Sequence, residues 1–398
     1  MKIGIYGGTF DPPHLGHMAG AEQIKEILGL DTLILVPAKN PPHKALEAES
    51  AAPEDRLAMV ELMAQGLDPA GGVTVDRQEL IRTGKSYTAE TVAQIAAQHP
   101  EDELWLVMGS DMFLTFHSWY RPQDICALAG ICGFTRVPGE DASPMKAQAK
   151  RLEESFGARA RVVALPEDVD VSSSDVRRLL REGRHREVSQ LLWSQVYGYI
   201  LRKGLYGVRR ELKSLPDYQL RAVSYSMMRA KRIPHVQGTE QEAVRLAERW
   251  GANVAYARRA AILHDCTKYY TVEEHFALCR QYGVELDPLE RQSEKLLHAK
   301  TGAALACHWF GEPVEVQAAI YYHTTGKGNM SLLEKILYLA DYMEPHRDFP
   351  GVEKLRALAY TDLDGAVALG CEMSIQEMEE KKREVHPNTR AALESLRD

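Results

Sequence analysis

The segment from Gly7 to His17 is the feature that most constrains the fold of the first half of the chain. It follows a short apolar run, residues 3–6, typical of a β-strand, and leads into residues 18–28, whose pattern is typical of a helix. A strand, a turn rich in glycine and proline, and a helix start together place backbone N–H groups at the positive end of a helix dipole. His14 lies three residues before His17, so both imidazoles project from one face of the first helical turn. The segment predicts a phosphate-binding pocket in which two imidazoles stabilise charge without a metal-ligand or nucleophile role; the plainer alternative is a strand–turn–helix with incidental histidines.

Length and composition limit the classes of protein to which the chain can belong. Its 398 residues suggest two or three domains, and 45% apolar with 26% charged residues is typical of a globular protein. The formal net charge of −8 argues against a nonspecific nucleic-acid-binding protein. No apolar run approaches the ~20 residues of a membrane helix, and Met1 leads directly into a strand, so we expect neither a membrane segment nor a signal peptide. Six cysteines without a C-x-x-C pair predict reduced thiols and a cytoplasmic protein.

Strand and helix patterns alternate through the first half. Five further apolar runs have the length of strands: residues 32–36, 73–75, 104–108, 131–135 and 162–165. Helical patterns at 54–65 and 88–97 separate some of them, which predicts an α/β domain whose parallel sheet is covered on both faces. Ligands of such folds bind at the carboxyl ends of strands. Candidate polar segments follow strands here too, at 7–17, 40–44, 109–111 and Arg136.

The Gly7–His17 segment resembles the H-x-G-H signature of nucleotidyltransferases with a Rossmann-like fold. Three further motifs, Pro41–Lys44, Ser86–Thr88 and Val171–Arg177, narrow the resemblance to the bacterial nicotinate-nucleotide adenylyltransferases. The resemblance covers residues 1 to about 206, and the motifs occur in the order of that family. One departure is Ser174, where the family usually has threonine; the hydroxyl is retained.

This resemblance implies that the 5′-phosphate of nicotinate mononucleotide attacks the α-phosphorus of ATP, and that Mg²⁺ arrives bound to ATP. Alignment and charge neutralisation then matter more than a protein nucleophile. The residues implied to bind ATP are Gly7, Gly8, Thr9, Phe10, His14, His17, Asp111, Ser173, Ser174 and Arg177. Those implied to bind the nicotinate nucleotide are His43, Lys44, Thr88, Trp119 and Arg136, and the implied catalytic residues are His14, His17 and Lys44. Two alternatives remain: the serines could cap a helix at 175–181, and Trp119 could be a core residue.

After about residue 210 the strand patterns disappear and helical spacing predominates. We expect helices at 218–229, 240–250, 255–264, 271–282, 301–309, 314–323, 332–343 and 363–382, with a charged helix beginning near 209–213. This predicts an all-α domain. The expected division is therefore an adenylyltransferase domain over residues 1–206 and a helical domain over residues 207–398.

Several histidines and aspartates fall at the ends of apolar helices in this second half. His264 and Asp265 follow the apolar residues 260–263, and Asp341 follows the apolar residues 336–340. Imidazoles combined with carboxylates suit iron, manganese or zinc. Cys266 could be a thiolate ligand, but a small buried apolar role is the better interpretation.

The order H…HD…D resembles the HD-domain metal phosphohydrolases. The sequences around these residues (231–236, 263–268, 322–326 and 338–347) resemble the bacterial HD-domain hydrolases that split diadenosine tetraphosphate symmetrically into two ADP. The resemblance covers roughly residues 213–395 and implies His235, His264, Asp265 and Asp341 as ligands of iron or another first-row transition metal. It implies phosphate contacts by His298, His323, Thr324 and Arg347, and charge neutralisation beside the metal by Lys268. His298 stays open between a second-metal ligand, a phosphate donor and a helix-start residue.

Taken together, the sequence predicts a bifunctional cytoplasmic enzyme acting on ATP, nicotinate mononucleotide and diadenosine tetraphosphate. We expect no nucleic-acid or membrane partner and leave a homo-oligomer open. Two alternatives remain: the first domain could adenylate another phosphate such as phosphopantetheine, and the HD domain could sense nucleotides or hydrolyse another one.

Overall fold

The computed structural model divides the chain into two units, Met1–Arg209 and Arg210–Asp398. It describes residues 1–40, 49–68, 71–135, 141–165 and 171–397. His43, Lys44 and Arg136, three of the predicted site residues, lie outside these ranges. Each unit is described by itself below.

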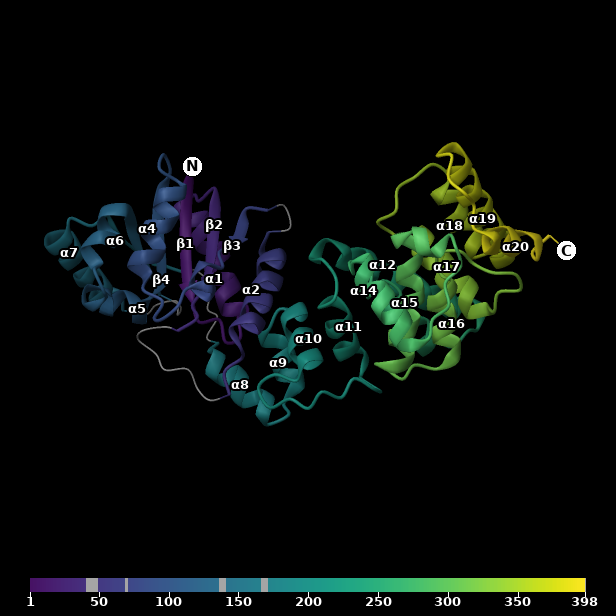
Figure 1. Ribbon diagram of the computed structural model, residues 1–398, viewed down its shortest axis with the longest axis horizontal. Coiled ribbons are helices and arrows are strands. Elements are labelled where there is room, and N and C mark those ends of the chain that lie inside the picture. Colours follow the sequence, from purple (N-terminus) through teal and green to yellow (C-terminus); the bar gives the residue numbers. More distant parts are fainter. Residues whose placement is uncertain (41–48, 69–70, 136–140, 166–170, 398) are drawn as a thin grey trace. The chain divides into compact units, whose positions relative to one another are not determined.

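A six-stranded parallel sheet forms the centre of the first unit, with the strand order β3-β2-β1-β4-β5-β6 (Figure 1). The strands are β1 (Lys2–Gly8), β2 (Thr32–Pro37), β3 (Val73–Val75), β4 (Glu103–Gly109), β5 (Ala129–Thr135) and β6 (Ala160–Ala164). β1 pairs with both β2 and β4, so the strand that leads into Gly7 and Gly8 lies in the middle of the sheet. The predicted α/β fold with a parallel sheet is confirmed.

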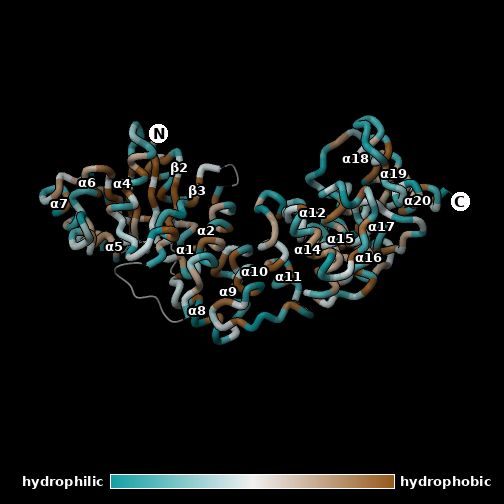
Figure 2. Tube along the Cα trace, viewed as in Figure 1, coloured by the Kyte–Doolittle hydropathy of each residue, from teal (hydrophilic) through white to brown (hydrophobic). Residues whose placement is uncertain are grey.

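The helices of this unit are α1 (Leu15–Leu28), α2 (Pro53–Leu67), α3 (Gln78–Ile81), α4 (Thr88–Gln98), α5 (Ser110–Thr115), α6 (Pro122–Leu128), α7 (Ser143–Phe156), α8 (Ser173–Arg181), α9 (His185–Leu191) and α10 (Ser194–Lys203). A large apolar core joins the sheet to α4, α5, α6 and α7 through Val92, Phe113, Ile125 and Leu152, all fully buried. Figure 2 shows the same concentration of hydrophobic residues along the strands. Burial on both faces explains why the inner strands β1, β2, β4 and β5 are nearly continuous apolar runs.

The turn after β1 is held in place by buried polar groups. The Asp11 carboxylate, 3% exposed, accepts hydrogen bonds from the backbone N–H of Ala51 (3.0 Å) and the hydroxyl of Tyr206 (2.8 Å). The guanidinium of Arg177 donates to the Asp11 carbonyl at 2.6 Å. Arg56 is fully buried and donates to four carbonyls of the surrounding loops, including that of Thr9 at 2.9 Å. Because buried polar groups are costly unless paired, this network fixes the backbone of the turn.

Ten α-helices make up the described part of the second unit, and no strand occurs there (Figure 1). They are α11 (Asp217–Tyr225), α12 (Ile233–Trp250), α13 (Val254–Leu263), α14 (Val272–Tyr282), α15 (Glu294–His308), α16 (Val314–Tyr322), α17 (Leu332–Met343), α18 (Val352–Ala359), α19 (Leu363–Glu380) and α20 (Pro387–Glu394). α12 packs against α13 and α17, and α15 packs against α16. The predicted all-α fold of this region is confirmed. In the described residues of both units, no helix is both long and apolar enough to cross a membrane.

Several expected helix boundaries in this unit are wrong: the first helix, expected at 218–229, ends at Tyr225, and α18 and α20 were not expected. Residues 209–213 are not helical, and α12 and α15 each begin seven residues earlier than expected, at Ile233 and Glu294. The first turn of α12 contains Pro234, and that of α15 begins with Glu294 and Lys295, so neither gives a clear helical pattern of apolar residues. In α12, Gly238 is required by a close approach, because a Cβ there would lie 2.4 Å from Oε2 of Glu344. The earlier starts place His235 and His298 inside helices.

We predict that Tyr206→Phe lowers the local unfolding free energy of the Asp11 turn by about 1–3 kcal/mol, because a buried carboxylate loses one donor. Hydrogen–deuterium exchange of peptides covering residues 8–18 measures this change. Tyr199→Phe is the matched control, since its hydroxyl also donates to a carboxylate, Asp55 (2.8 Å), but one that is only partly buried. Equal protection in the Tyr206 variant and the native chain would contradict the role given to this bond.

Candidate active sites

A cavity of about 390 Å³ opens at the carboxyl ends of β1 and β4 in the first unit. The predicted ATP-binding residues that line it are Gly7, Gly8, Thr9, Phe10, His14, His17, Asp111, Ser173 and Ser174. Of the predicted nicotinate-nucleotide residues in the described ranges, both Thr88 and Trp119 line it as well. The motifs that are distant in the sequence therefore meet at one cavity.

The two histidines of the turn form a close pair. Their ring centroids are 3.8 Å apart, and His14, the residue preceding α1, is 4% exposed. The backbone N–H of His14 donates to Nδ1 of His17 at 3.2 Å. Because Nδ1 accepts this bond, the neutral ring of His17 carries its proton on Nε2. His17 is thus arranged to donate a hydrogen bond from Nε2 to an anionic oxygen.

The three serines before α8 have different partners. Ser172 caps the helix, since its Oγ accepts from the backbone N–H of Asp175 at 3.1 Å, as the capping alternative expected. Ser173 Oγ donates to the carbonyl of Pro12 at 3.0 Å, which ties α8 to the turn after β1. Ser174 Oγ accepts from Arg177 at 3.2 Å. All three serines line the cavity.

The structure shows how Arg177 and Trp119 lie relative to the cavity, which the sequence alone left open. Arg177 is 3% exposed, contacts Asp11 and does not line the cavity, so the structure places it behind the turn. Trp119 both lines the cavity and packs on Phe116, with ring centroids 5.2 Å apart. Core packing and a ring-stacking role are therefore compatible for this side chain.

Two further lining residues, Glu79 and Ser86, had no predicted role. Burial raises the pKa of the Glu79 carboxyl, which accepts a hydrogen bond from the Thr91 hydroxyl at 2.6 Å. Glu79 lies on α3, a four-residue helix too short to give a periodic pattern. Ser86 belongs to the Ser86–Thr88 motif, and that motif was the only signal available for it.

In the second unit, the four predicted metal ligands converge from α12, the turn after α13, and α17. His235 Nε2 lies 2.9 Å from Asp341 Oδ1 and 3.9 Å from Asp265 Oδ2. His264 Nε2 lies 3.5 Å from Asp265 Oδ2 and 3.8 Å from Asp341 Oδ1. His235, His264 and Asp265 are one of three groups in the described residues whose ligand atoms lie close enough to hold a metal ion.

The hydrogen bonds of the imidazoles suit metal binding. Nδ1 of His264 lies 2.6 Å from the Ala261 carbonyl, and Nδ1 of His235 lies 3.1 Å from a carboxylate oxygen of Glu344. Each Nδ1 therefore carries a proton and donates it, which leaves the Nε2 lone pair facing the two aspartates. His264 Nε2 is buried without a hydrogen-bond partner. Nitrogen lone pairs that face carboxylates need a cation or proton between them, so this set of donors fits a metal ion.

A second group of potential ligands shares Asp265. His298 Nε2 lies 3.0 Å from Asp265 Oδ1 and 3.1 Å from His323 Nε2, and these three residues form another candidate metal group. Lys268 lies beside them, 3.2 Å from His298 and 3.4 Å from Asp265. Burial lowers the pKa of both His298 and His323. Neighbouring positive groups lower both pKa values further. Both rings are thus neutral, which leaves the ligand and phosphate-donor alternatives open for His298.

The two aspartates stay ionised in spite of their burial. Desolvation alone would raise the pKa of Asp265, but His264 and His298 outweigh it and hold that pKa well below its usual range. For Asp341, hydrogen bonding to His235 and the proximity of His264 overcome desolvation in the same way and lower its pKa. The ionised carboxylates of Asp265 and Asp341, facing the imidazole nitrogens, are an arrangement that suits a cation.

Comparisons with known proteins identify both units. The Cytidylyltransferase-like family matches residues 5–179, and the HD domain family matches residues 232–345. A "Probable nicotinate-nucleotide adenylyltransferase" of Listeria monocytogenes is 32% identical over 206 residues, which is 52% of this chain and 97% of that protein. A "Bis(5'-nucleosyl)-tetraphosphatase, symmetrical" of Halalkalibacterium halodurans is 42% identical over 166 residues, which is 42% of this chain and 88% of that protein.

The chain joins a nicotinate-nucleotide adenylyltransferase family domain to an HD domain. It is thus an enzyme with nucleotidyltransferase and HD-hydrolase domains, as predicted. A solved structure described as a "predicted HD superfamily hydrolase involved in NAD metabolism" from Clostridium acetobutylicum is 36% identical, covers 46% of this chain and 97% of that chain, and has a TM-score of 0.44.

The remaining predicted residues of the HD domain lie around its candidate metal centre. Arg347 is 3.2 Å from Asp341 Oδ1 through its Nη2. The Thr324 hydroxyl, next to His323, is inaccessible to solvent and has no hydrogen-bond partner. Cys266 is fully buried, and burial raises the pKa of its thiol to about 12, which supports the apolar interpretation over a thiolate ligand. All six cysteines are free, as expected.

Arg232 and Glu344 contact the candidate ligands although no role was predicted for them. The guanidinium of Arg232 lies 2.5 Å from Asp265 Oδ2. Glu344 is 1% exposed and accepts hydrogen bonds from His235 Nδ1 and from the backbone N–H of His346 (2.7 Å). Both residues belong to the sequence segments that carried the HD-domain resemblance, which was the only signal for them. A carboxylate behind a metal-binding imidazole fixes the ring and raises its basicity.

We predict that Glu344→Gln weakens metal binding by about 10- to 100-fold, because the side chain keeps its shape but loses the charge behind His235. Competition titration with a chelator of known affinity measures this change. Glu353→Gln is the control, since the Glu353 side chain is 81% exposed on α18. Native affinity in the Glu344 variant would show that this carboxylate does not support the metal site.

Proposed function

We propose that the first unit transfers AMP from ATP to nicotinate mononucleotide, giving deamido-NAD and pyrophosphate. The observation that carries this proposal is the convergence of three separated motifs, Gly7–His17, Ser86–Thr88 and Val171–Arg177, on one cavity that His14 and His17 line as a close pair. The similarity of this unit to nicotinate-nucleotide adenylyltransferases supports the choice of substrate. The cavity lies at the carboxyl ends of the strands, where parallel α/β folds bind their ligands, and this position also supports adenylyl transfer there.

Adenylyl transfer requires that the two substrates are positioned and that the charge of their phosphates is neutralised. A phosphate oxygen of the nucleotide forms a bond to the α-phosphorus of ATP, and the bond to the pyrophosphate oxygen breaks. The Nε2–H of His17 and the first-turn N–H groups of α1 and α8 donate to the phosphate oxygens as negative charge develops. Mg²⁺ bound to ATP would neutralise part of that charge. Arg177 and Ser173 hold the turn in the geometry that these donors need.

Three proposed contacts of this unit lie outside the described residues. We assign His43 and Lys44 to the nucleotide phosphates, with Lys44 as a catalytic cation, and Arg136 to the nicotinate nucleotide. Trp119 stacks on the nicotinate ring, and Thr88 binds the same nucleotide. Asp111 and the Gly7–Phe10 backbone contact ATP.

Acceptor specificity tests the assignment of the first unit. Pyrophosphate release from ATP is measured with nicotinate mononucleotide, nicotinamide mononucleotide and phosphopantetheine as separate acceptors. Turnover with nicotinate mononucleotide and none with phosphopantetheine is expected. The reverse preference would move this unit to another branch of the nucleotidyltransferases.

We predict that His17→Ala lowers kcat of adenylyl transfer by about 10²–10³-fold, the usual loss for one donor to a developing charge. His99→Ala is the control, because His99 precedes β4 at the opposite end of the sheet from the cavity. A His17 variant with native kcat would mean that the paired imidazoles do not contact the reacting phosphates.

For the second unit, we propose metal-assisted hydrolysis of diadenosine tetraphosphate into two ADP. The convergence of His235, His264, Asp265 and Asp341 carries this proposal, and the similarity to a symmetrical bis(5'-nucleosyl)-tetraphosphatase supports the substrate. Iron or another first-row transition metal held by these residues would supply a Lewis acid and a bound water of lowered pKa. Six free thiols support a reducing, cytoplasmic location.

The chain's own groups then orient the polyphosphate and balance its charge. Attack of water oxygen on one central phosphorus breaks its bond to the bridging oxygen, so each product is one ADP. Lys268 and Arg347 neutralise negative charge beside Asp265 and Asp341, respectively. The imidazole of His298 and the hydroxyl of Thr324 contact phosphate oxygens. The Nδ1–H of His323 donates to the Ile320 carbonyl at 2.7 Å, so its Nε2 lone pair suits a metal ligand better than a donor to phosphate.

Product analysis tests this second assignment. The protein is incubated with diadenosine tetraphosphate and Fe²⁺, Mn²⁺ or Co²⁺, and the nucleotides are separated by anion exchange. We expect ADP as the only product, and its formation to stop when the metal is removed with a chelator. AMP together with ATP would contradict symmetrical cleavage, and no turnover with any metal would make the HD domain a sensing module.

A further inference from the structure

A cavity of about 670 Å³ lies next to the candidate metal centre but contains none of its proposed ligands. The N-terminal turn of α15, the turn after α16, α19 and the segment leading to α20 form its wall. Leu297 of the cavity directly precedes His298, and Thr324 of the cavity directly follows His323. Since an α-helix rises 1.5 Å per residue, His298 lies about 6 Å along α15 from its first residue, Glu294. The cavity and the candidate metal centre are therefore formed by adjoining residues of the same two segments.

Several hydrogen-bond donors face this cavity without an acceptor. The Thr324 hydroxyl oxygen is inaccessible to solvent and has no partner. Ser293 precedes α15 but provides no side-chain cap, and within the described residues the backbone N–H groups of Glu294 and Lys295 donate to no acceptor. Glu294 and Lys295 are exposed, so their N–H groups are accessible to a ligand, and a helix N-terminus attracts anions. These groups together suit phosphate oxygens.

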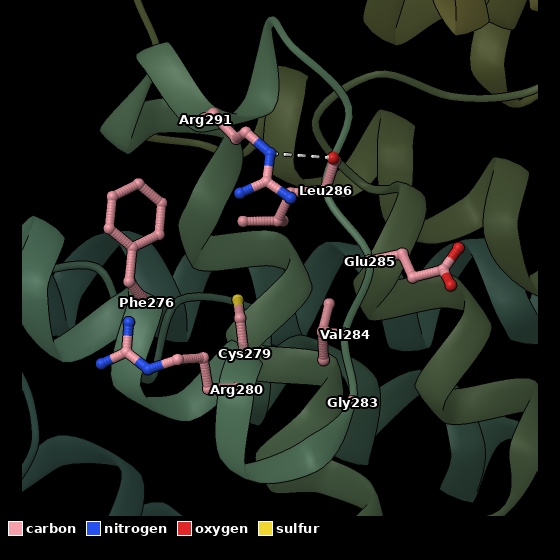
Figure 3. A pocket seen from close by; sticks show the side chains of 8 residues that line it. All are labelled: Phe276, Cys279, Arg280, Gly283, Val284, Glu285, Leu286 and Arg291. Carbon is pink, nitrogen blue, oxygen red and sulfur yellow. Dashed lines mark hydrogen bonds between the residues drawn. The ribbon is translucent and has the colours of Figure 1, made fainter.

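Basic side chains add positive charge at the same place. Arg291, Lys295 and Arg383 line the cavity, and none of them forms an ion pair with another described residue. Figure 3 shows Arg291 from the side of a neighbouring cavity, where its Nε donates to the Leu286 carbonyl at 3.2 Å and the rest of the guanidinium stays available. These three cations outnumber the carboxylates in the lining.

The other titratable groups of the wall are negatively charged or already paired, so they do not favour anion binding. Two carboxylates, Glu294 and Glu384, also line the cavity and reduce its net charge to +1. His386 is already paired with Asp287 at 2.8 Å. Asp287 and Glu290 form the third candidate metal group with His386, but the Lys300 ammonium lies 2.9 Å from Glu290 and supplies the cation there. This network is therefore a structural wall of the cavity.

The cavity also has the size and apolar lining of a nucleotide site. Its volume falls within the roughly 300–1,000 Å³ of small-molecule sites. Leu289, Met378 and Val385 contribute apolar surface opposite the basic groups. A base and ribose can thus contact apolar side chains while a diphosphate contacts the donors.

We propose that this cavity binds the nucleoside diphosphate half of a dinucleoside polyphosphate, away from the metal. The N-terminus of α15, the Thr324 hydroxyl, Lys295 and Arg383 contact its phosphates. The inference rests on the proposed function of the second unit and extends it, because it explains how that unit selects a long substrate with two nucleoside ends.

The double variant Lys295→Ala/Arg383→Ala tests this proposal in the full-length, metal-loaded protein. KM for diadenosine tetraphosphate is measured, and Kd for ADP is measured separately by calorimetry. Since a charge-assisted hydrogen bond is worth about one factor of ten in affinity, we expect both constants to rise about tenfold or more. The increase in KM should exceed any fall in kcat.

Arg280→Ala is the matched control. Arg280 is an exposed arginine on α14 that lines the neighbouring cavity of about 760 Å³, beside Phe276, and not the proposed site (Figure 3). Unchanged constants in the double variant, or an equal rise in the Arg280 variant, would overturn the proposal. If the native protein fails to hydrolyse diadenosine tetraphosphate, the proposed function falls, and the ADP affinities of the same variants still decide whether the cavity binds a nucleoside diphosphate.

Discussion

The buried carboxylate of Asp265 is the group on which the HD domain depends. It is fully buried, and side chains from three parts of the domain converge on it: Arg232 before α12, His264 and Lys268 from its own turn after α13, and His298 of α15. An ionised carboxylate in such a place is stable only when cations and hydrogen bonds surround it. The requirement to surround Asp265 therefore gathers the ends of separate helices at one point, and this point is where the candidate metal ligands meet.

In the first unit the corresponding constraint acts on the backbone. The turn after β1 must present N–H groups and the imidazoles of His14 and His17 to a cavity, and such a turn has few contacts of its own. Asp11, Arg56 and Arg177 supply them from behind, through bonds to carbonyls and N–H groups of the loops. Preorganised donors of this kind cost no reorganisation when charge develops in the substrate. Buried charged groups thus support the cavity-lining turn in the first unit and the candidate metal ligands in the second.

Much of this architecture could be predicted from the sequence because its signals are local. The four inner strands are buried on both faces and are continuous apolar runs, and the edge strands β3 and β6 are short β-branched segments, so all six lie where the sequence indicated. The Gly7–His17 segment pointed to the cavity. The beginnings of α12 and α15 could not be predicted from local sequence. Contacts with distant parts of the chain decide which residues are tolerated at Gly238 and near Ser293. The roles of Glu344 and Arg177 could not be predicted for the same reason. Tertiary contacts decide whether a charged side chain lines a cavity or supports a neighbouring residue, and such contacts leave no periodic pattern in the sequence.

The central claim is that one chain carries two chemically separate sites, one of them dependent on a metal held around Asp265. The most direct measurement is made on Asp265→Asn, an isosteric change, with metal content, adenylyl transfer and diadenosine tetraphosphate hydrolysis determined on one preparation. We predict loss of bound metal and of hydrolysis, with adenylyl transfer at the native rate. Hydrolysis that persists without bound metal, or a loss of adenylyl transfer in this variant, would contradict the account.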